Sequence, residues 1–77
     1  MEPRQLVHFL GKVEQRIAED KDYMARQRQI LNLLAKECRD TNEAERLMRA
    51  FEAVHQQHEF LRAQLLTELS TFRCWTF

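Results

Sequence analysis

The stretch that decides the fold is Cys38-Arg-Asp-Thr-Asn-Glu-Ala-Glu45, which interrupts an otherwise continuous helical pattern. Its centre, Asp40-Thr41-Asn42, consists of residue types that cap helix N-termini, and Glu43 follows Asp40 at the spacing of a capping box. Acidic side chains in a first helical turn also complement the helix dipole. We therefore expect a short turn at residues 39–41 between two helices.

An apolar repeat with alternating steps of three and four residues runs on both sides of this turn, as expected for helices that pack along a seam. Its positions in the first half are Leu6, Leu10, Val13, Ile17, Asp20, Met24, Gln27, Leu31, Leu34 and Cys38. Its positions in the second half are Ala44, Leu47, Phe51, Val54, His58, Leu61, Leu65, Glu68, Phe72 and Trp75. The pattern predicts helices over residues 3–38 and 42–72, followed by an aromatic tail at 73–77.

A short connection makes two long amphipathic helices antiparallel neighbours. The predicted fold is therefore all-α: residues 1–77 form a single coiled-coil-like helical hairpin. Folding the chain about residues 40–41 places Leu34 opposite Leu47 and Met24 opposite His58. It also places Gly11 beside Phe72, where the glycine either makes room for the ring or is a tolerated cost of ~1 kcal/mol.

The composition argues against several classes of protein. The 77 residues include one Gly and one Pro, which leaves little turn chemistry for strands. Twelve basic residues balance twelve acidic ones, so a weak nucleic-acid-binding regulator is only an alternative reading. No segment approaches membrane-spanning length and no signal-type apolar run follows the N-terminus, so we expect a cytoplasmic protein without membrane contact.

Cys38 and Cys74 fall at opposite ends of the predicted hairpin. This placement favours two reduced thiols over a disulfide within one chain. A disulfide between chains through Cys74 is the alternative.

The segment Glu52-Ala-Val-His55-Gln-Gln-His58 contains the one candidate metal motif, because Glu-x-x-His supplies metal ligands in helical bundles. The residues expected to face it, 27–30, offer an arginine and no carboxylate, which disfavours a dication. A seam histidine needs a hydrogen-bond partner, which Asp20 or Gln27 can provide. The predicted polar seam residues are Asp20, Gln27 and His58. The alternative is a metal site made of Glu52, His55 and His58.

Several short motifs occur between Ile17 and Leu69. They are Arg26-Gln27-Arg28, Asp40-Thr41, Ala44, Phe51-Glu52, His58, and Arg62 with Leu65-Leu66. Together they resemble a group of short, uncharacterised bacterial helical proteins, and the resemblance implies a hairpin but no activity. Such proteins often carry Gly just before the Asp-Thr pair, where this chain has Cys38, which argues against a glycine-type helix cap here.

The apolar stripe is wider than one partner helix can cover, which predicts self-association of two hairpins into a four-helix bundle. The C-terminal aromatic residues either cap the hairpin core or form a docking site for a second copy or another protein. The candidate interface residues are Leu6, Phe9, Leu10, Tyr23, Ile30, Leu69, Phe72, Trp75 and Phe77.

No phosphate-binding glycine loop, Cys-His pair or activated hydroxyl is evident in the sequence. We therefore expect a non-enzymatic interaction module, acting as a small adaptor, chaperone or regulator. It is expected to use no cofactor and no small-molecule substrate.

Overall fold

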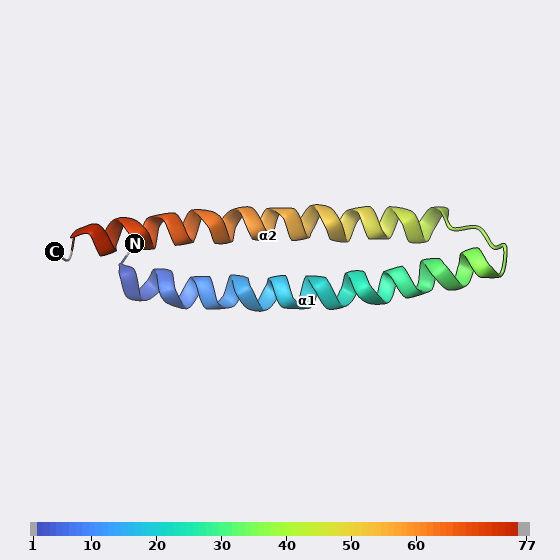
Figure 1. The fold of residues 1–77 in the computed structure, drawn as a ribbon, viewed down its shortest axis with the longest axis horizontal. Coiled ribbons are helices and arrows are strands. Elements are labelled where there is room, and N and C mark those ends of the chain that lie inside the picture. The colour runs from blue at the N-terminus through green and yellow to red at the C-terminus, as the bar shows by residue number, and fades with distance from the viewer. Residues whose placement is uncertain (1, 76–77) are drawn as a thin grey trace.

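The computed structural model describes the backbone of residues 2–75 and the side chains of residues 2–72. It consists of two antiparallel α-helices, α1 (Pro3–Lys36) and α2 (Asn42–Trp75), each 34 residues long. The helices lie side by side along their length, with the connection at one end and both chain ends at the other (Figure 1). The overall dimensions are 61 × 16 × 14 Å. The predicted all-α hairpin is confirmed for the described residues.

The first turn of α1 is stabilised by its own sequence. Pro3 occupies the first helical position, where a missing N–H costs nothing. The side-chain oxygen of Gln5 accepts a hydrogen bond from the backbone N–H of Glu2 at 3.2 Å. One of the N–H groups that a helix start leaves unpaired is thereby satisfied.

The C-terminal end of α1 is a Schellman motif built around Cys38. The N–H of Arg39 donates to the carbonyl of Leu34 at 2.9 Å, and the N–H of Cys38 donates to the carbonyl of Ala35 at 3.2 Å. Cys38 has φ of 56°, in the left-handed region that glycine normally occupies. The expectation that a glycine-type cap is absent was therefore wrong: the cap forms with cysteine in the glycine position. As a result α1 ends at Lys36 rather than at residue 38.

The start of α2 uses the polar residues of the connection. The carboxylate of Asp40 accepts a hydrogen bond from the N–H of Asn42 at 3.0 Å, and the carbonyl of Thr41 accepts one from the N–H of Glu45 at 2.8 Å. The hydroxyl of Thr41 also donates to the Glu45 carboxylate at 3.1 Å. Residues 37–41 thus connect the two helices.

At its far end α2 continues to Trp75, so residues 73–75 belong to the helix and not to a tail. No Gly or Pro occurs in this segment to stop the helix.

The apolar core lies in the half of the hairpin farther from the connection. Leu6, Val13, Ile17 and Leu65 are buried there, and Leu10, Leu61 and Leu69 pack against them. In α1 every predicted seam position from Leu6 to Leu34 is buried or half-buried, whereas Cys38 is exposed in the connection.

The seam of α2 differs from the predicted one. Leu47 and Val54 are 47% and 43% exposed, while Met48 and His55 face α1 in their place. Leu69 similarly faces α1 in place of Glu68. The helix is rotated relative to the expectation because two histidines, rather than one, turn toward Asp20 of α1.

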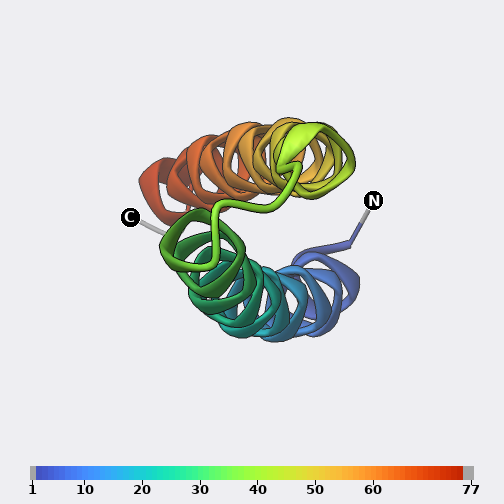
Figure 2. The same cartoon turned by 90° about the vertical axis from the view of Figure 1, so that its right-hand side faces the viewer.

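The pairing level of the helices also differs from the prediction. Asp20 contacts His58 and Glu14 contacts Arg62, so residues of α1 meet α2 residues one to two turns closer to the connection than expected. The early end of α1 moves the midpoint of the bend toward residue 39, which accounts for part of this shift. Figure 2, viewed from the connection, shows the two helices crossing as they leave it.

Gly11 makes no room for Phe72. It is exposed, and a Cβ placed on it would meet no atom within 4 Å. The glycine therefore costs helix stability without a packing benefit.

We expect Gly11→Ala to raise the free energy of unfolding by about 0.5–1 kcal/mol, measured by urea denaturation at fixed protein concentration. Ala18→Gly, one heptad along on the same exposed line, should lower it by a similar amount. An unchanged midpoint for both variants would contradict the exposure assigned to this line.

The left-handed Cys38 gives a second stability prediction. Cys38→Gly removes the Cβ clash of this conformation, partly offset by the greater freedom of glycine in the unfolded chain, and should stabilise the hairpin by about 0.5–1 kcal/mol. Cys38→Val should destabilise it, because a β-branched residue tolerates positive φ poorly. Both variants lack the thiol, so oxidation cannot explain a difference in their melting temperatures. Equal melting temperatures would show that residue 38 is not in this conformation.

Candidate functional site

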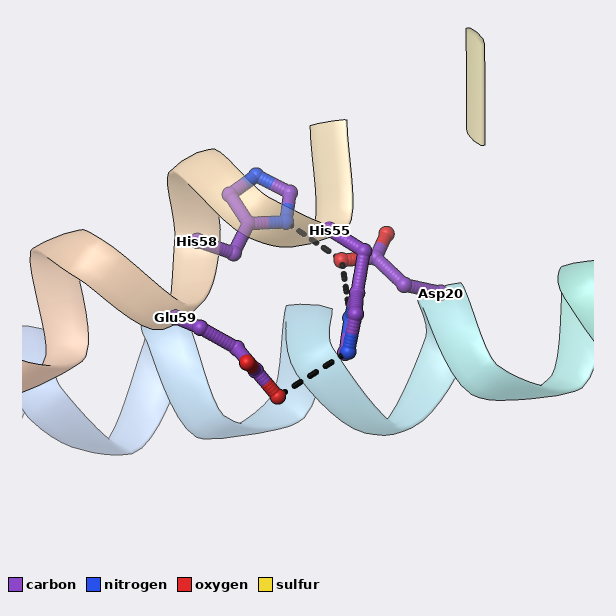
Figure 3. A network of polar contacts seen from close by, with 4 residues as sticks. All are labelled: Asp20, His55, His58 and Glu59. Atoms are coloured by element: carbon purple, nitrogen blue, oxygen red, sulfur yellow. Dashed lines mark hydrogen bonds and ion pairs between the residues drawn. The ribbon is translucent and has the colours of Figure 1, made fainter. Parts of the chain in front are cut away.

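The most distinctive group of polar side chains lies between the helices, centred on Asp20 (Figure 3). Asp20 is 9% exposed, in the middle of α1, and its Oδ2 lies 2.6 Å from Nδ1 of His58 on α2. An ionised carboxylate only accepts hydrogen bonds, so His58 donates from Nδ1. This contact joins the two helices across the seam, and it provides the buried carboxylate with the partner that it requires.

A second histidine, His55, approaches the same carboxylate oxygen. Its Nδ1 lies 3.6 Å from Oδ2 of Asp20, too far for a hydrogen bond, and this nitrogen is buried with no partner. Its Nε2 lies 3.0 Å from Oε1 of Glu59 on the same helix. With its N–H on Nε2 the ring can donate to Glu59, while Nδ1 faces Asp20 without a hydrogen bond. We call Asp20, His55, His58 and Glu59 the polar cluster.

Gln27 forms a separate polar contact closer to the connection. Its side chain is buried, and its amide Nε2 donates to the backbone carbonyl of Ala44 at 3.0 Å. The structure thus places Asp20, Gln27 and His58 between the helices, with His55 as a further member that the sequence pattern had assigned to the flank. The signal for His55 was its i, i+3 spacing from His58, which puts both rings on one side of a helix.

The proposed metal ligands do not come together as the motif suggested. Glu52 is exposed, and the carboxylate that meets both histidines is Asp20 of the other helix. Among the described residues, no group of three or more His, Cys, Asp or Glu side chains is arranged to hold a metal ion. The cluster is instead a set of hydrogen-bonding and charged contacts across a helix interface.

A second feature is a line of exposed apolar side chains along one side of the hairpin. Ile30 of α1 and Leu47 of α2 border the same shallow hollow near the connection. Tyr23, seven residues before Ile30, stacks on Phe51 with ring centroids 5.6 Å apart and an interplanar angle of 7°. We call this surface the apolar face. Its exposed members are Phe9, Tyr23, Ile30, Leu47 and Val54.

The predicted interface residues fall into three groups. Phe9, Tyr23 and Ile30 are exposed on the apolar face. Leu6 is fully buried within one chain, and Leu10 and Leu69 pack against it, so these three residues belong to the hairpin core. Phe72 is 37% exposed near the chain ends, while the Trp75 side chain and Phe77 lie outside the described part of the structure.

The opposite side of the hairpin is mainly charged. A shallow hollow there is bordered by Glu14, Lys21, Glu59 and Arg62 together with Ile17 and Ala18. Glu14 and Arg62 form an exposed ion pair at 3.5 Å, which contributes little stability. An apolar hollow also occurs on this side, near the chain ends, where Val7 and Leu66 are exposed. Charged residues thus border the middle of this side, and apolar residues its part near the chain ends.

Comparisons of the chain with protein-family models, with curated protein sequences and with solved structures found no match. Within the described residues, neither α1 nor α2 has an apolar stretch long enough to cross a lipid bilayer.

The polar cluster makes a prediction about stability. Asp20→Ala removes the hydrogen-bond partner of His58 and the carboxylate beside His55, and should lower the free energy of unfolding by about 2 kcal/mol. Replacing Asp20, His55 and His58 together by Leu should instead raise it, because a packed apolar layer is commonly at least as stable as a buried charged one. Thermal unfolding followed by circular dichroism distinguishes the variants. If Asp20→Ala unfolds like the unaltered chain, the cluster does not hold the helices together.

Proposed function

We propose that the protein is a non-enzymatic helical interaction module that associates with a second copy of itself to form a four-helix bundle. The observation that supports this most strongly is the apolar face. Five large apolar side chains are exposed there at 41% or more, on one side of a thin rod. Contiguous apolar surface of this kind is typical of an interaction site.

The total surface of the chain supports the same proposal. The isolated hairpin has an accessible surface of 6525 Å², whereas a compact monomer of its mass, 9.3 kDa, exposes ~5,000 Å². The excess of about 1,500 Å² is in the range that each chain of a stable homodimer buries, since a standard interface takes ~800 Å² per partner and obligate homodimers take more. Pairing two rods would remove most of this excess.

The polar cluster supports a role in specificity. Polar groups within a helical seam reduce stability but select register and partner number. Any arrangement of the helices that breaks the Asp20–His58 hydrogen bond is higher in free energy. Each chain therefore presents one defined surface to its partner. An adaptor, a chaperone or a regulator would all use such a surface.

Self-association is tested by sedimentation equilibrium at micromolar concentration, where we expect twice the mass of one chain. Val54→Gln, which adds a polar group to the apolar face, should weaken the dimer by about tenfold or more. The matched control is Leu66→Gln on the opposite side, because Val54 and Leu66 are 43% and 41% exposed. The control should leave the mass unchanged. A folded monomer for the unaltered chain would overturn the proposal.

A further inference from the structure

We infer that Asp20 is a positioning residue for self-association: it holds α2 in the rotation that exposes Leu47 and Val54, and without its carboxylate α2 turns and buries them. This inference rests on the proposed function and adds to it the internal contact that produces the docking surface. Asp20 is 9% exposed between the helices, so it acts on the apolar face without touching the second copy.

Two sets of positions on α2 compete to face α1. Both sets share the inward positions 44, 51, 58 and 65, which repeat every seven residues. The apolar set adds an apolar residue at each of three successive levels, whereas the mixed set adds one apolar and two polar residues. In this order the added residues are Leu47, Val54 and Leu61, and Met48, His55 and Arg62. Burial of apolar surface alone therefore favours turning the apolar set toward α1.

On the connection side of the polar cluster, the structure uses the mixed set. Met48 is 7% exposed and His55 is half-buried, whereas Leu47 and Val54 are 47% and 43% exposed. The Nδ1 atom of His55 is buried with no hydrogen-bond partner among the described residues. This choice is unfavourable in terms of burial, so a polar contact has to offset it.

On the other side of the polar cluster, α2 returns to the apolar set. Leu61 packs against the buried core, and Arg62 is exposed. Leu61 follows Val54 by seven residues and continues the same line along the helix. One half of the hairpin thus already packs the apolar set against α1, which indicates that this rotation of α2 is sterically compatible with α1.

The change from one set to the other occurs where Asp20 meets the two histidines (Figure 3). Oδ2 of Asp20 lies 2.6 Å from Nδ1 of His58 and 3.6 Å from Nδ1 of His55. A rotation that brought Val54 inward would carry both rings away from this oxygen and leave a buried carboxylate unpaired, which is strongly unfavourable. Asp20 therefore selects the observed rotation, and without its charge the apolar set is favoured.

Two apolar replacements of Asp20 test this inference in the full-length chain. Asp20→Leu and Asp20→Met fill the seam without needing a hydrogen-bond partner, and methionine adapts its shape if leucine fits poorly. We expect both variants to remain helical, with a dimer weakened by about tenfold or more although no residue of the apolar face is changed. Sedimentation equilibrium gives the dissociation constants, and circular dichroism reports the helix content.

The matched control is Asp20→Asn. Its amide oxygen accepts the hydrogen bond from His58, so this variant should keep the rotation of α2 and the affinity of the dimer.

A thiol probe reports the rotation of α2 directly. In a chain carrying Cys38→Ser and Cys74→Ser, either Leu47→Cys or Met48→Cys supplies a single thiol, which is alkylated in dilute, monomeric solution. With Asp20 present, residue 47 should react about tenfold faster than residue 48, because a buried thiol reacts only when the structure opens locally. The order should reverse with Asp20→Leu or Asp20→Met, and it should persist with Asp20→Asn.

The outcomes separate this inference from the proposed function. A reversed labelling order together with a weakened dimer supports the positioning role of Asp20. An unchanged order in both apolar variants overturns it, and so does a reversed order with an unchanged dissociation constant. If the unaltered chain is a folded monomer, the proposed function fails, while the labelling order still decides whether Asp20 sets the rotation of α2.

Discussion

The buried carboxylate of Asp20 is the constraint on which the rest of the structure depends. A charge placed between two helices costs several kcal/mol unless it is paired, and here α2 supplies the partner through His58. Sliding α2 by one turn, or rotating it so that Leu47 and Val54 pointed inward, would leave that charge without its hydrogen bond. Apolar contacts alone would tolerate such movements, because leucines and valines occur at many neighbouring positions. The polar contact therefore fixes both the rotation and the height of α2 against α1.

The exposed apolar face follows from this constraint. The rotation of α2 that turns His55 and His58 toward Asp20 also turns Leu47 and Val54 outward. These two residues then lie on the same side of the hairpin as Tyr23 and Ile30. If both histidines were apolar, no polar contact would favour this rotation of α2, and burying Leu47 and Val54 would be favoured instead. The chain thus loses part of its own core to a polar contact and gains an apolar surface. In an isolated hairpin this leaves Leu47 and Val54 exposed to water, whereas a partner on this surface would bury them.

The sequence predicted the elements of the fold well and their relative placement less well. The two helices and the seam of α1 are predictable, because a strict alternation of three and four residues defines one side of a helix. The seam of α2 is ambiguous, since Leu47-Met48 and Val54-His55 each offer two adjacent candidates, and only a contact with α1 decides between them. The end of α1 was misplaced because cysteine was not expected in a left-handed cap. His58 was recognised as a polar position of the seam, but the approach of His55 to Asp20 depends on the rotation of α2 and has no signature within either helix alone.

The distribution of the core along the rod explains where assembly should matter most. The half near the chain ends is packed around Leu6, Val13, Ile17 and Leu65, and needs little help. The half near the connection is held by the buried side chains of Met48 and Gln27, and by others such as Ile30 and Leu47 that remain about half exposed. A second copy on the apolar face would cover Ile30 and Leu47 in this half, so the proposed assembly would supply core where the single chain has least.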